Sequence, residues 1–405
     1  MDALPHETEL IATIAVGLSA AFVGGLIAHR LRLPTLVGYL LAGVVVGPFT
    51  PGFVADAHLA PQLAEIGVIL LMFGVGNHFS IGDLLAVRRL ALPGAIGQVA
   101  VATALGFGLT RLWEWDVGAG LVFGLALSVA STVVLLRALE ARDALTTEPD
   151  RVAVGWLVVE DLIMVLVLVL LPAIALALGG MEGAAEGFDS ASLAQTLLIT
   201  FVKVALFVAL MLVGGVRLIP WLLRRVEATG SRELFILAVL AAALGIAYGA
   251  AELFGVSFAL GAFLAGVVVN ESELSHRAAE EAMPLREAFA VLFFVSVGML
   301  IDPGFLVAEV GRITAVAAII MLGKALAAVL FVRVLGGTAE IGFVVAAGLS
   351  QIGEFSFILA SMGLALGLLP AEGNNLILAG ALVTITLNPL LFAAIEPMRA
   401  RWAVV

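Results

Sequence analysis

The sequence predicts an all-α protein that crosses a membrane many times, and three observations support this prediction. First, 62% of the 405 residues are hydrophobic and 13% are charged, whereas soluble domains have about 25% charged residues. Second, the apolar residues form runs long enough to cross a bilayer as helices, which pair their own backbone polar groups. Third, a pattern of glycine and aliphatic residues recurs in the two halves of the chain.

About thirteen apolar segments are predicted to be membrane helices, so all 405 residues are expected to form one transmembrane domain. Their expected ranges are 9–29, 35–48, 60–79, 90–113, 117–139, 152–178, 193–219, 232–254, 257–270, 286–301, 309–335, 340–366 and 374–395. The segments 35–48, 257–270 and 286–301 are expected to be short, and Asn388-Pro389 predicts a break or an end in the last segment.

An internal repeat relates the two halves of the chain at offsets of 222 or 223 residues. The matching pairs are Gly38–Val46 with Gly261–Val269, Val75-Gly76 with Val297-Gly298, and Leu127-Ser128 with Leu349-Ser350. Seven segments separate the members of each pair, an odd number, so the two copies run in opposite directions. We expect inverted repeats over about 35–178 and 257–395, the plan of secondary transporters that bind substrate near the midplane of the bilayer.

The distribution of basic residues predicts the orientation, because cytoplasmic loops of membrane proteins are rich in lysine and arginine. If the N-terminus lies outside, only Arg111 and Arg312 among the arginines are external, together with the acidic stretch 181–189. All other arginines then lie on the cytoplasmic side. The N-terminus is therefore expected outside and the C-terminus in the cytoplasm. Its first residues have no basic region, so no cleaved signal peptide is expected.

Two adjacent carboxylates, Glu160 and Asp161, lie inside the apolar run Gly155–Leu171. A charge at the centre of a membrane helix costs about 2.5–3.5 kcal/mol, so such residues usually serve ion or proton pathways. The alternative is a helix-packing pair that neighbouring groups satisfy. Adjacent helical positions differ by about 100° in direction. One carboxylate is therefore expected to face an ion path while the other turns to a protein partner.

Polar residues lie at equivalent mid-depth positions of the two repeats. They are Ser131 and Thr132 in segment 117–139, and Ser350, Gln351, Gly353 and Glu354 in segment 340–366. Such positions predict discontinuous helices that expose carbonyls and half-helix ends. The hydroxyls of Ser131 and Thr132 could instead bond back to their own helix, and Glu354 could cap a half-helix instead of binding an ion.

The two lysines of the chain, Lys203 and Lys324, both lie in predicted spans. Lys203 lies near a span end and is expected to reach the interface. Lys324 lies mid-span, so a carboxylate partner is expected, with Glu160 or Asp161 as the candidates. The chain contains no cysteine, no HExxH and no nucleotide-binding glycine motif, so neither a thiol site nor an enzyme is predicted.

Several stretches together resemble one family over nearly all 405 residues. They are RLPTLVGYLLAGVVVGP (32–48), GWLVVEDLIMVLVLVLLP (155–172), SFALGAFLAGVVVNESELSHRAAE (257–280), AFAVLFFVSVGML (288–300) and SQIGEFSFILA (350–360). The chain resembles the cation:proton antiporter-2 family, the Kef-type potassium/proton antiporters. The resemblance implies the sodium/proton-exchanger fold with two crossed broken helices and a homodimer.

The resemblance also implies an assignment of the segments. It places core helices at about 90–178 and 309–395, a dimerisation panel at about 9–79 and 232–301, and a linker helix at about 193–219. It assigns the ion-binding carboxylate to Asp161, a core lysine to Lys324, and the helix breaks to 130–132 and 350–354. Glu160 departs from the Kef pattern, which has glutamine before the aspartate. Close members also carry a cytoplasmic nucleotide-binding RCK-type domain after the last helix, beyond the end of this sequence, so no cofactor is expected for these residues.

The function expected from these features is exchange of K⁺, or alternatively Na⁺, for H⁺ across a bacterial inner membrane. Asp161 would bind the cation or the proton in turn, with Ser131, Thr132 and freed carbonyls as further oxygen ligands. Glu160 and Lys324 are expected to form a fixed ion pair beside this site, which favours electroneutral exchange. The alternatives are a gated cation channel and a membrane receptor with vestigial transport residues. No nucleic-acid partner is expected.

Overall fold

The computed structural model describes residues 9–51, 59–77, 81–140, 147–175, 178–180 and 190–402, and these are helical almost throughout. No strand occurs within these ranges. The chain divides into two compact units, residues 1–25, 38–79 and 188–300 in the first and residues 26–37, 80–187 and 301–405 in the second.

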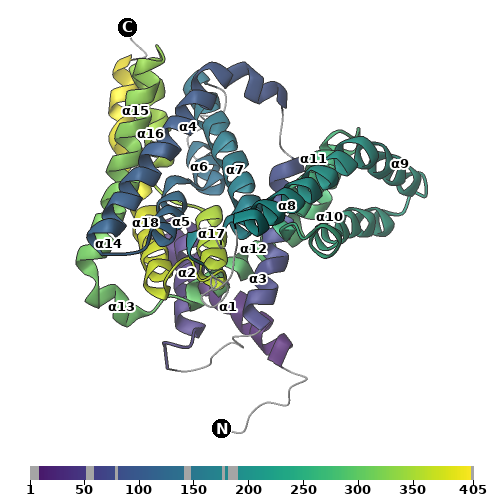
Figure 1. Ribbon diagram of the computed structural model, residues 1–405, viewed down its shortest axis with the longest axis horizontal. Coiled ribbons are helices and arrows are strands. Elements are labelled where there is room, and N and C mark those ends of the chain that lie inside the picture. Colours follow the sequence, from purple (N-terminus) through teal and green to yellow (C-terminus); the bar gives the residue numbers. More distant parts are fainter. Residues whose placement is uncertain are drawn as a thin grey trace. The chain divides into compact units, whose positions relative to one another are not determined.

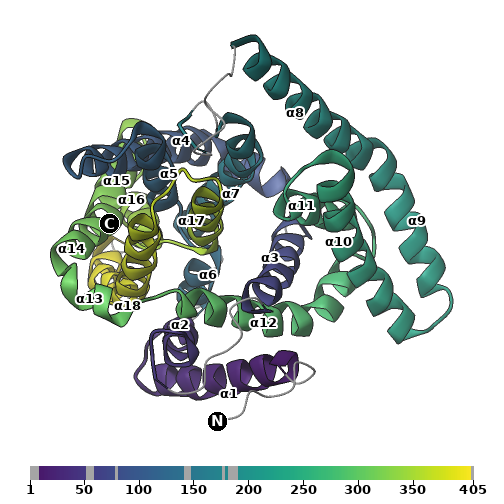
Figure 2. The same ribbon diagram turned by 60° about the horizontal axis from the view of Figure 1, so that its bottom comes forward.

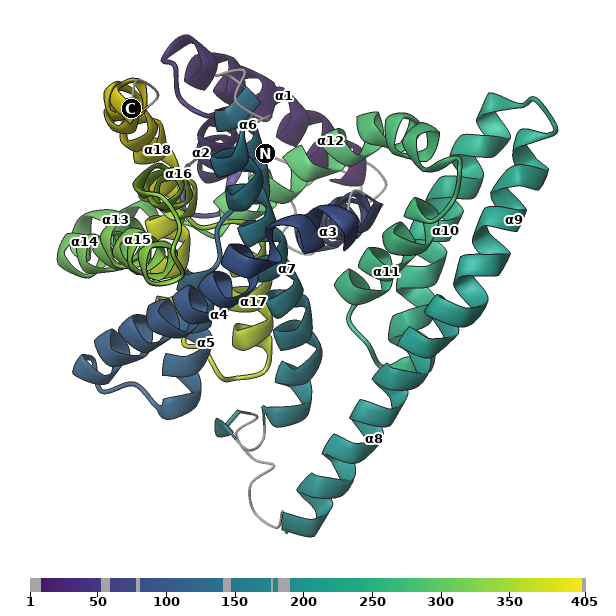
Figure 3. The ribbon, with the colours of Figure 1, turned by 90° about the horizontal axis from the view of Figure 1, so that it is seen from above.

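The first unit is built around α3 (Leu59–Asn77), which packs on α11 (Phe258–Asn270) and α12 (Ser275–Met299). It also contains most of α1 (Glu9–Arg30) and α2 (Thr35–Val46), together with α10 (Arg232–Phe254). The helix α8 (Ser190–Leu210) continues through the π-helix η3 (Met211–Gly215) into α9 (Val216–Glu227), and Figure 3 shows this run as one long rod beside α10. Helix α12 begins eleven residues before the expected segment, so it is not short.

The second unit contains the predicted site. Its helices are α4 (Ile81–Leu112), α5 (Val117–Ser128), α6 (Thr132–Glu140), α7 (Glu148–Ile174), α13 (Pro303–Ala308), α14 (Val310–Ala318), α15 (Lys324–Val334), α16 (Ala339–Leu349), α17 (Glu354–Ala365) and α18 (Ala371–Trp402). The π-helix η4 (Ile319–Gly323) joins α14 to α15. Within this unit α4 packs on α5, α7 and α15, while α17 lies beside α5 and α18 (Figures 1 and 2).

A buried apolar cluster surrounds the helices that bear the carboxylates. Trp156 and Leu157 of α7 pack with Leu135 of α6 and Val345 of α16, and all four side chains are fully buried. A Cβ on Gly94 would lie 2.2 Å from the Trp156 ring, so this glycine lets α4 approach α7 closely. Close packing without voids fixes α7 against its neighbours.

Every expected segment contains a helix, but their lengths differ. By length and composition, eight helices of the described chain are able to cross a membrane, and the bent pair α16 and α17 makes a ninth. Shorter apolar helices account for the segments around α2, α5 and α11. The break expected at Asn388-Pro389 is wrong, because α18 continues past both residues to Trp402. The acidic stretch 181–189, which the sequence predicts to be external, is not among the described residues.

Candidate functional site

Helix α7 places Glu160 and Asp161 near its middle. Its first turn contains Pro149 and two acidic residues, Glu148 and Asp150, which favour a helix start through the fixed φ of proline and the helix dipole. The side chains downstream are buried, since Glu160 is 0% and Asp161 4% exposed. The structure therefore confirms two buried carboxylates in the middle of an apolar helix.

The first helix break lies between α5, which ends at Ser128, and α6, which begins at Thr132. The three residues between them, Val129 to Ser131, are almost fully buried. The two carboxylates of α7 hold this break at neighbouring points. The backbone N–H of Ala130 donates to Glu160 Oε2 at 2.9 Å, and Thr132 Oγ1 donates to Asp161 Oδ2 at 2.9 Å.

The second helix break lies between α16, which ends at Leu349, and α17, which begins at Glu354, with a bend of 46°. It meets the first break directly. The N–H of Ser131 donates to Gln351 Oε1, and Gln351 Nε2 donates to the Ser131 carbonyl, both at 3.1 Å. A Cβ on Gly353 would lie 2.5 Å from the Ser131 Cα, so this position requires glycine. Both breaks lie at the sequence positions where they were expected.

Lys324 and Glu160, which were expected to pair, interact through their charges but form no direct ion pair. Lys324 is 0% exposed, and its Nζ donates to the backbone carbonyl of Gln351 at 2.9 Å. Within the described residues, no carboxylate oxygen lies within 4.0 Å of this ammonium group. Lys324 instead satisfies a carbonyl that the second break leaves without a helical partner.

The hydroxyl groups and Glu354 take more specific positions than the sequence indicated. Ser131 Oγ accepts from the N–H of Val134 at 3.2 Å, which caps α6, and Thr132 bonds to Asp161 and not to its own helix. Glu354 is the first residue of α17 and is 3% exposed. A carboxylate is favourable at this end of a helix.

Four polar contacts beside the breaks were not predicted from the sequence. Gln98 Nε2 donates to the Ser128 carbonyl at 3.1 Å, and Asn388 Nδ2 donates to the Ala347 carbonyl at 2.7 Å. Ser350 Oγ reaches Ala346 O at 2.7 Å and Met321 O, in the π-helix η4, at 3.1 Å. Gln98 and Asn388 could have been singled out as lone polar residues in apolar runs. Nothing in the sequence, however, identifies the carbonyls that they contact.

Three buried carboxylate oxygens at this site have no hydrogen-bond partner in the described part of the chain. They are Asp161 Oδ1, Glu160 Oε1 and Glu354 Oε2. Burying an unpaired charge is expensive, so such a group takes up a cation or a proton. Asp161 also has no basic side chain within 4.0 Å among the described residues. The site therefore offers a carboxylate, a hydroxyl and backbone oxygens, which suit a hard cation and a proton.

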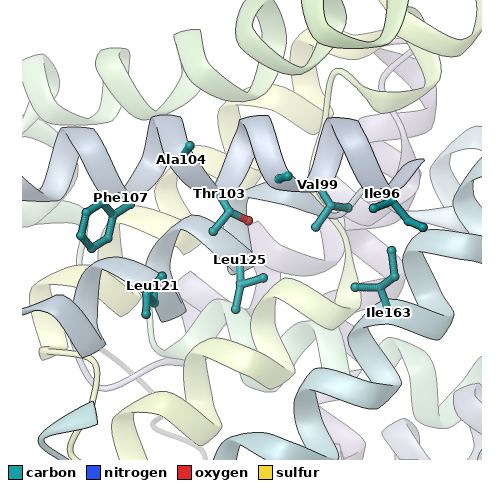
Figure 4. A pocket seen from close by; sticks show the side chains of 9 residues that line it. Ile96, Val99, Thr103, Ala104, Phe107, Leu121, Leu125 and Ile163 are labelled. Carbon is teal, nitrogen blue, oxygen red and sulfur yellow. The ribbon is translucent and has the colours of Figure 1, made fainter. Parts of the chain in front are cut away.

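An open pocket of about 530 Å³ lies between α4, α5 and α7 in the same unit (Figure 4). Ile163, two residues after Asp161, points into it, and Thr103 is its one polar side chain. Because the lining is otherwise aliphatic or aromatic, this pocket offers a cation almost no ligands. The helix breaks, with their carboxylates and backbone oxygens, are the better candidate for a cation site.

Comparisons with known proteins agree on the family. Residues 17–395 match the sodium/hydrogen exchanger transmembrane family. YbaL of Escherichia coli (strain K12), provisionally assigned as a cation/proton antiporter, is 59% identical over 98% of this chain and 70% of its own length. K(+) efflux antiporter 4 of Arabidopsis thaliana is 32% identical over 97% of this chain and 65% of its own length.

A solved structure shows the same fold. The sodium proton antiporter MjNhaP1 from Methanocaldococcus jannaschii matches with a TM-score of 0.71 and 18% identity, over 96% of this chain and 98% of that chain. This likeness confirms the exchanger fold that the sequence predicted. Taken with the family match over residues 17–395, it places the chain plainly: it belongs to the sodium/hydrogen exchanger family.

Proposed function

We propose that the protein is a secondary active antiporter that exchanges a monovalent cation for H⁺. The main support for this proposal is that Asp161 is buried where two broken helices meet. Its Oδ2 accepts from Thr132, and its Oδ1 has no hydrogen-bond partner among the described residues. A single carboxylate binds either the cation or the proton at one time. Competition for it couples the two fluxes if only the neutralised site moves between the two sides of the membrane.

The proposed cation ligands are oxygens of the first break together with Asp161. The carboxylate and the Thr132 hydroxyl lie together already. The Ser131 hydroxyl caps α6 with one lone pair and has a second lone pair for the cation. Glu160 is held by the Ala130 amide and is proposed to orient the break beside the site, while Glu354 adds negative charge from the start of α17.

The proposed cation is K⁺, with Na⁺ as the alternative. A relative that matches 97% of this chain is named as a K(+) efflux antiporter, which supports K⁺. We further propose a homodimer in a bacterial inner membrane, with the N-terminus outside and the C-terminus in the cytoplasm. The arginine distribution supports this orientation.

Replacing Asp161 tests the function. Asp161→Asn preserves size and hydrogen bonding but cannot bind a proton in exchange for a cation, so it is expected to fold and to lose exchange. Purified protein in liposomes with an internal pH dye reports proton movement after addition of K⁺ or Na⁺. Asp116→Asn makes the same chemical change at an exposed position before α5 and is expected to exchange like the wild type. Wild-type exchange in Asp161→Asn would overturn the proposal.

A further inference from the structure

Gln351 joins the two helix breaks through a single side chain. Its Oε1 accepts from Ser131 N–H, and its Nε2 donates to the carbonyls of Ser131 and Gly348, each at 3.1 Å. Both amide protons are therefore used, one on the first break and one on the last turn of α16. The side chain is 0% exposed, so water does not compete for these bonds.

The Ser131 peptide lies between the two residues that meet the carboxylates. Ala130 N–H bonds to Glu160, Ser131 bonds through both N–H and carbonyl to Gln351, and Thr132 Oγ1 bonds to Asp161. Three successive residues thus have three different side-chain partners. A rotation of the Ser131 peptide would turn the Ala130 carbonyl and displace Thr132 from Asp161.

Gln351 also decides which backbone oxygens are available to a cation. It occupies the carbonyls of Ser131 and Gly348. In the described chain, no hydrogen-bond donor reaches the carbonyls of Val129 and Ala130 in the first break. The number and the spacing of coordinating oxygens govern discrimination between K⁺ and Na⁺.

We propose that Gln351 is a positioning residue that sets the cation affinity and the cation selectivity of the exchanger. By donating to the Ser131 and Gly348 carbonyls, it makes them unavailable to the cation and fixes the orientation of the remaining oxygens. The inference rests on the proposed exchange function. Preorganised ligands bind more tightly because less ordering accompanies binding.

Gln98 provides a matched control for a purely structural role. It is also a glutamine, it is also 0% exposed, and its Nε2 also donates to a backbone carbonyl, that of Ser128 at the end of α5. Unlike Gln351, it forms no bond to the second break. Gln98→Met and Gln351→Met therefore remove comparable groups, but only Gln351→Met releases one break from the other.

The experiment measures exchange in proteoliposomes as a function of K⁺ and of Na⁺ concentration. Gln351→Met removes all three hydrogen bonds of the side chain and is expected to raise the apparent KM for K⁺ about tenfold or more. The ratio of the K⁺ and Na⁺ affinities is expected to move toward one, with little change in maximal rate. Gln98→Met is expected to lower the thermal stability and to retain the wild-type KM and ratio.

Gln351→Asn provides a second variant in case the methionine variant does not fold, since it keeps the amide but is too short for both breaks. It is expected to shift KM and selectivity in the same direction. A folded Gln351 variant with wild-type KM and ratio would overturn the inference, and so would failure of both variants to fold, because Gln351 would then serve the fold alone. Absence of exchange in the wild type would instead overturn the proposed function.

Discussion

Glu160 and Asp161 are neighbours in sequence with different partners in space. Asp161 bonds to a hydroxyl and Glu160 to a backbone amide, as the divergence of adjacent helical positions predicts. The sequence could locate these groups because charges stand out in an apolar run. It could not identify the hydrogen-bond acceptor of Lys324, because the Gln351 carbonyl becomes available only when the second helix breaks.

Glu160 is expected to stabilise the first break by accepting from the Ala130 N–H. A glutamine in its place keeps an oxygen that accepts from Ala130 N–H, whereas leucine leaves this buried donor unsatisfied. We expect Glu160→Leu to lower the free energy of unfolding by about 1–3 kcal/mol and Glu160→Gln to change it by less than about 1 kcal/mol. Thermal unfolding of the two variants in the same detergent measures the difference. Equal losses in both would show that the bond to Ala130 is unimportant.

At the scale of the helices, the two breaks were predictable and several helix ends were not. Serine, glycine and glutamate inside apolar runs indicated the breaks at 130–132 and 350–354. Asn388-Pro389 gave a false signal because the asparagine amide donates to Ala347 of a neighbouring helix. Membrane helices also tolerate proline when neighbours satisfy the freed groups. The π-helix before Lys324 has no sequence signature, and the Met321 carbonyl within it accepts from Ser350 Oγ.

Contact between the breaks predicts the effect of a methyl group at Gly353. Its Cβ would lie 2.5 Å from Ser131 Cα and 2.7 Å from Ser131 N, where only backbone movement gives relief. Gly353→Ala is expected to lower the free energy of unfolding by about 1–3 kcal/mol, in the range of overpacking, and to impair exchange. Gly108→Ala in α4 is the control, because nothing lies within 4 Å of its Cβ. If the two variants unfold at the same temperature, the breaks are not in contact.

At the scale of the whole molecule, apolar length predicted where helices occur but not how many cross the bilayer. Every expected segment contains a helix, yet α2, α5 and α11 are short. The packing of such helices depends on partners distant in the sequence, so it cannot be predicted from the residues of a single segment. The inverted repeats, the core and panel assignment and the homodimer stay predictions from the repeat pattern and the family resemblance.

The orientation is testable on the intact chain. Because nearly all arginines fall on one side of the predicted spans, a reporter fused after Val405 is expected to be active in the cytoplasm. The same reporter inserted within the acidic stretch 181–189 is expected to be active in the periplasm. Periplasmic activity of the C-terminal fusion would reverse the orientation or change the number of spans.

Uphill transport of K⁺ distinguishes proton-coupled exchange from a channel, because a channel with the same polar site cannot perform it. Proteoliposomes contain equal K⁺ on both sides, an acidic interior, and a permeant lipophilic ion that holds the membrane potential near zero. We expect internal K⁺ to rise above external K⁺ as protons leave, and Asp161→Asn vesicles to show no rise. Internal K⁺ that stays equal to external K⁺ in wild-type vesicles, while K⁺ itself still crosses the membrane, would contradict proton-coupled exchange.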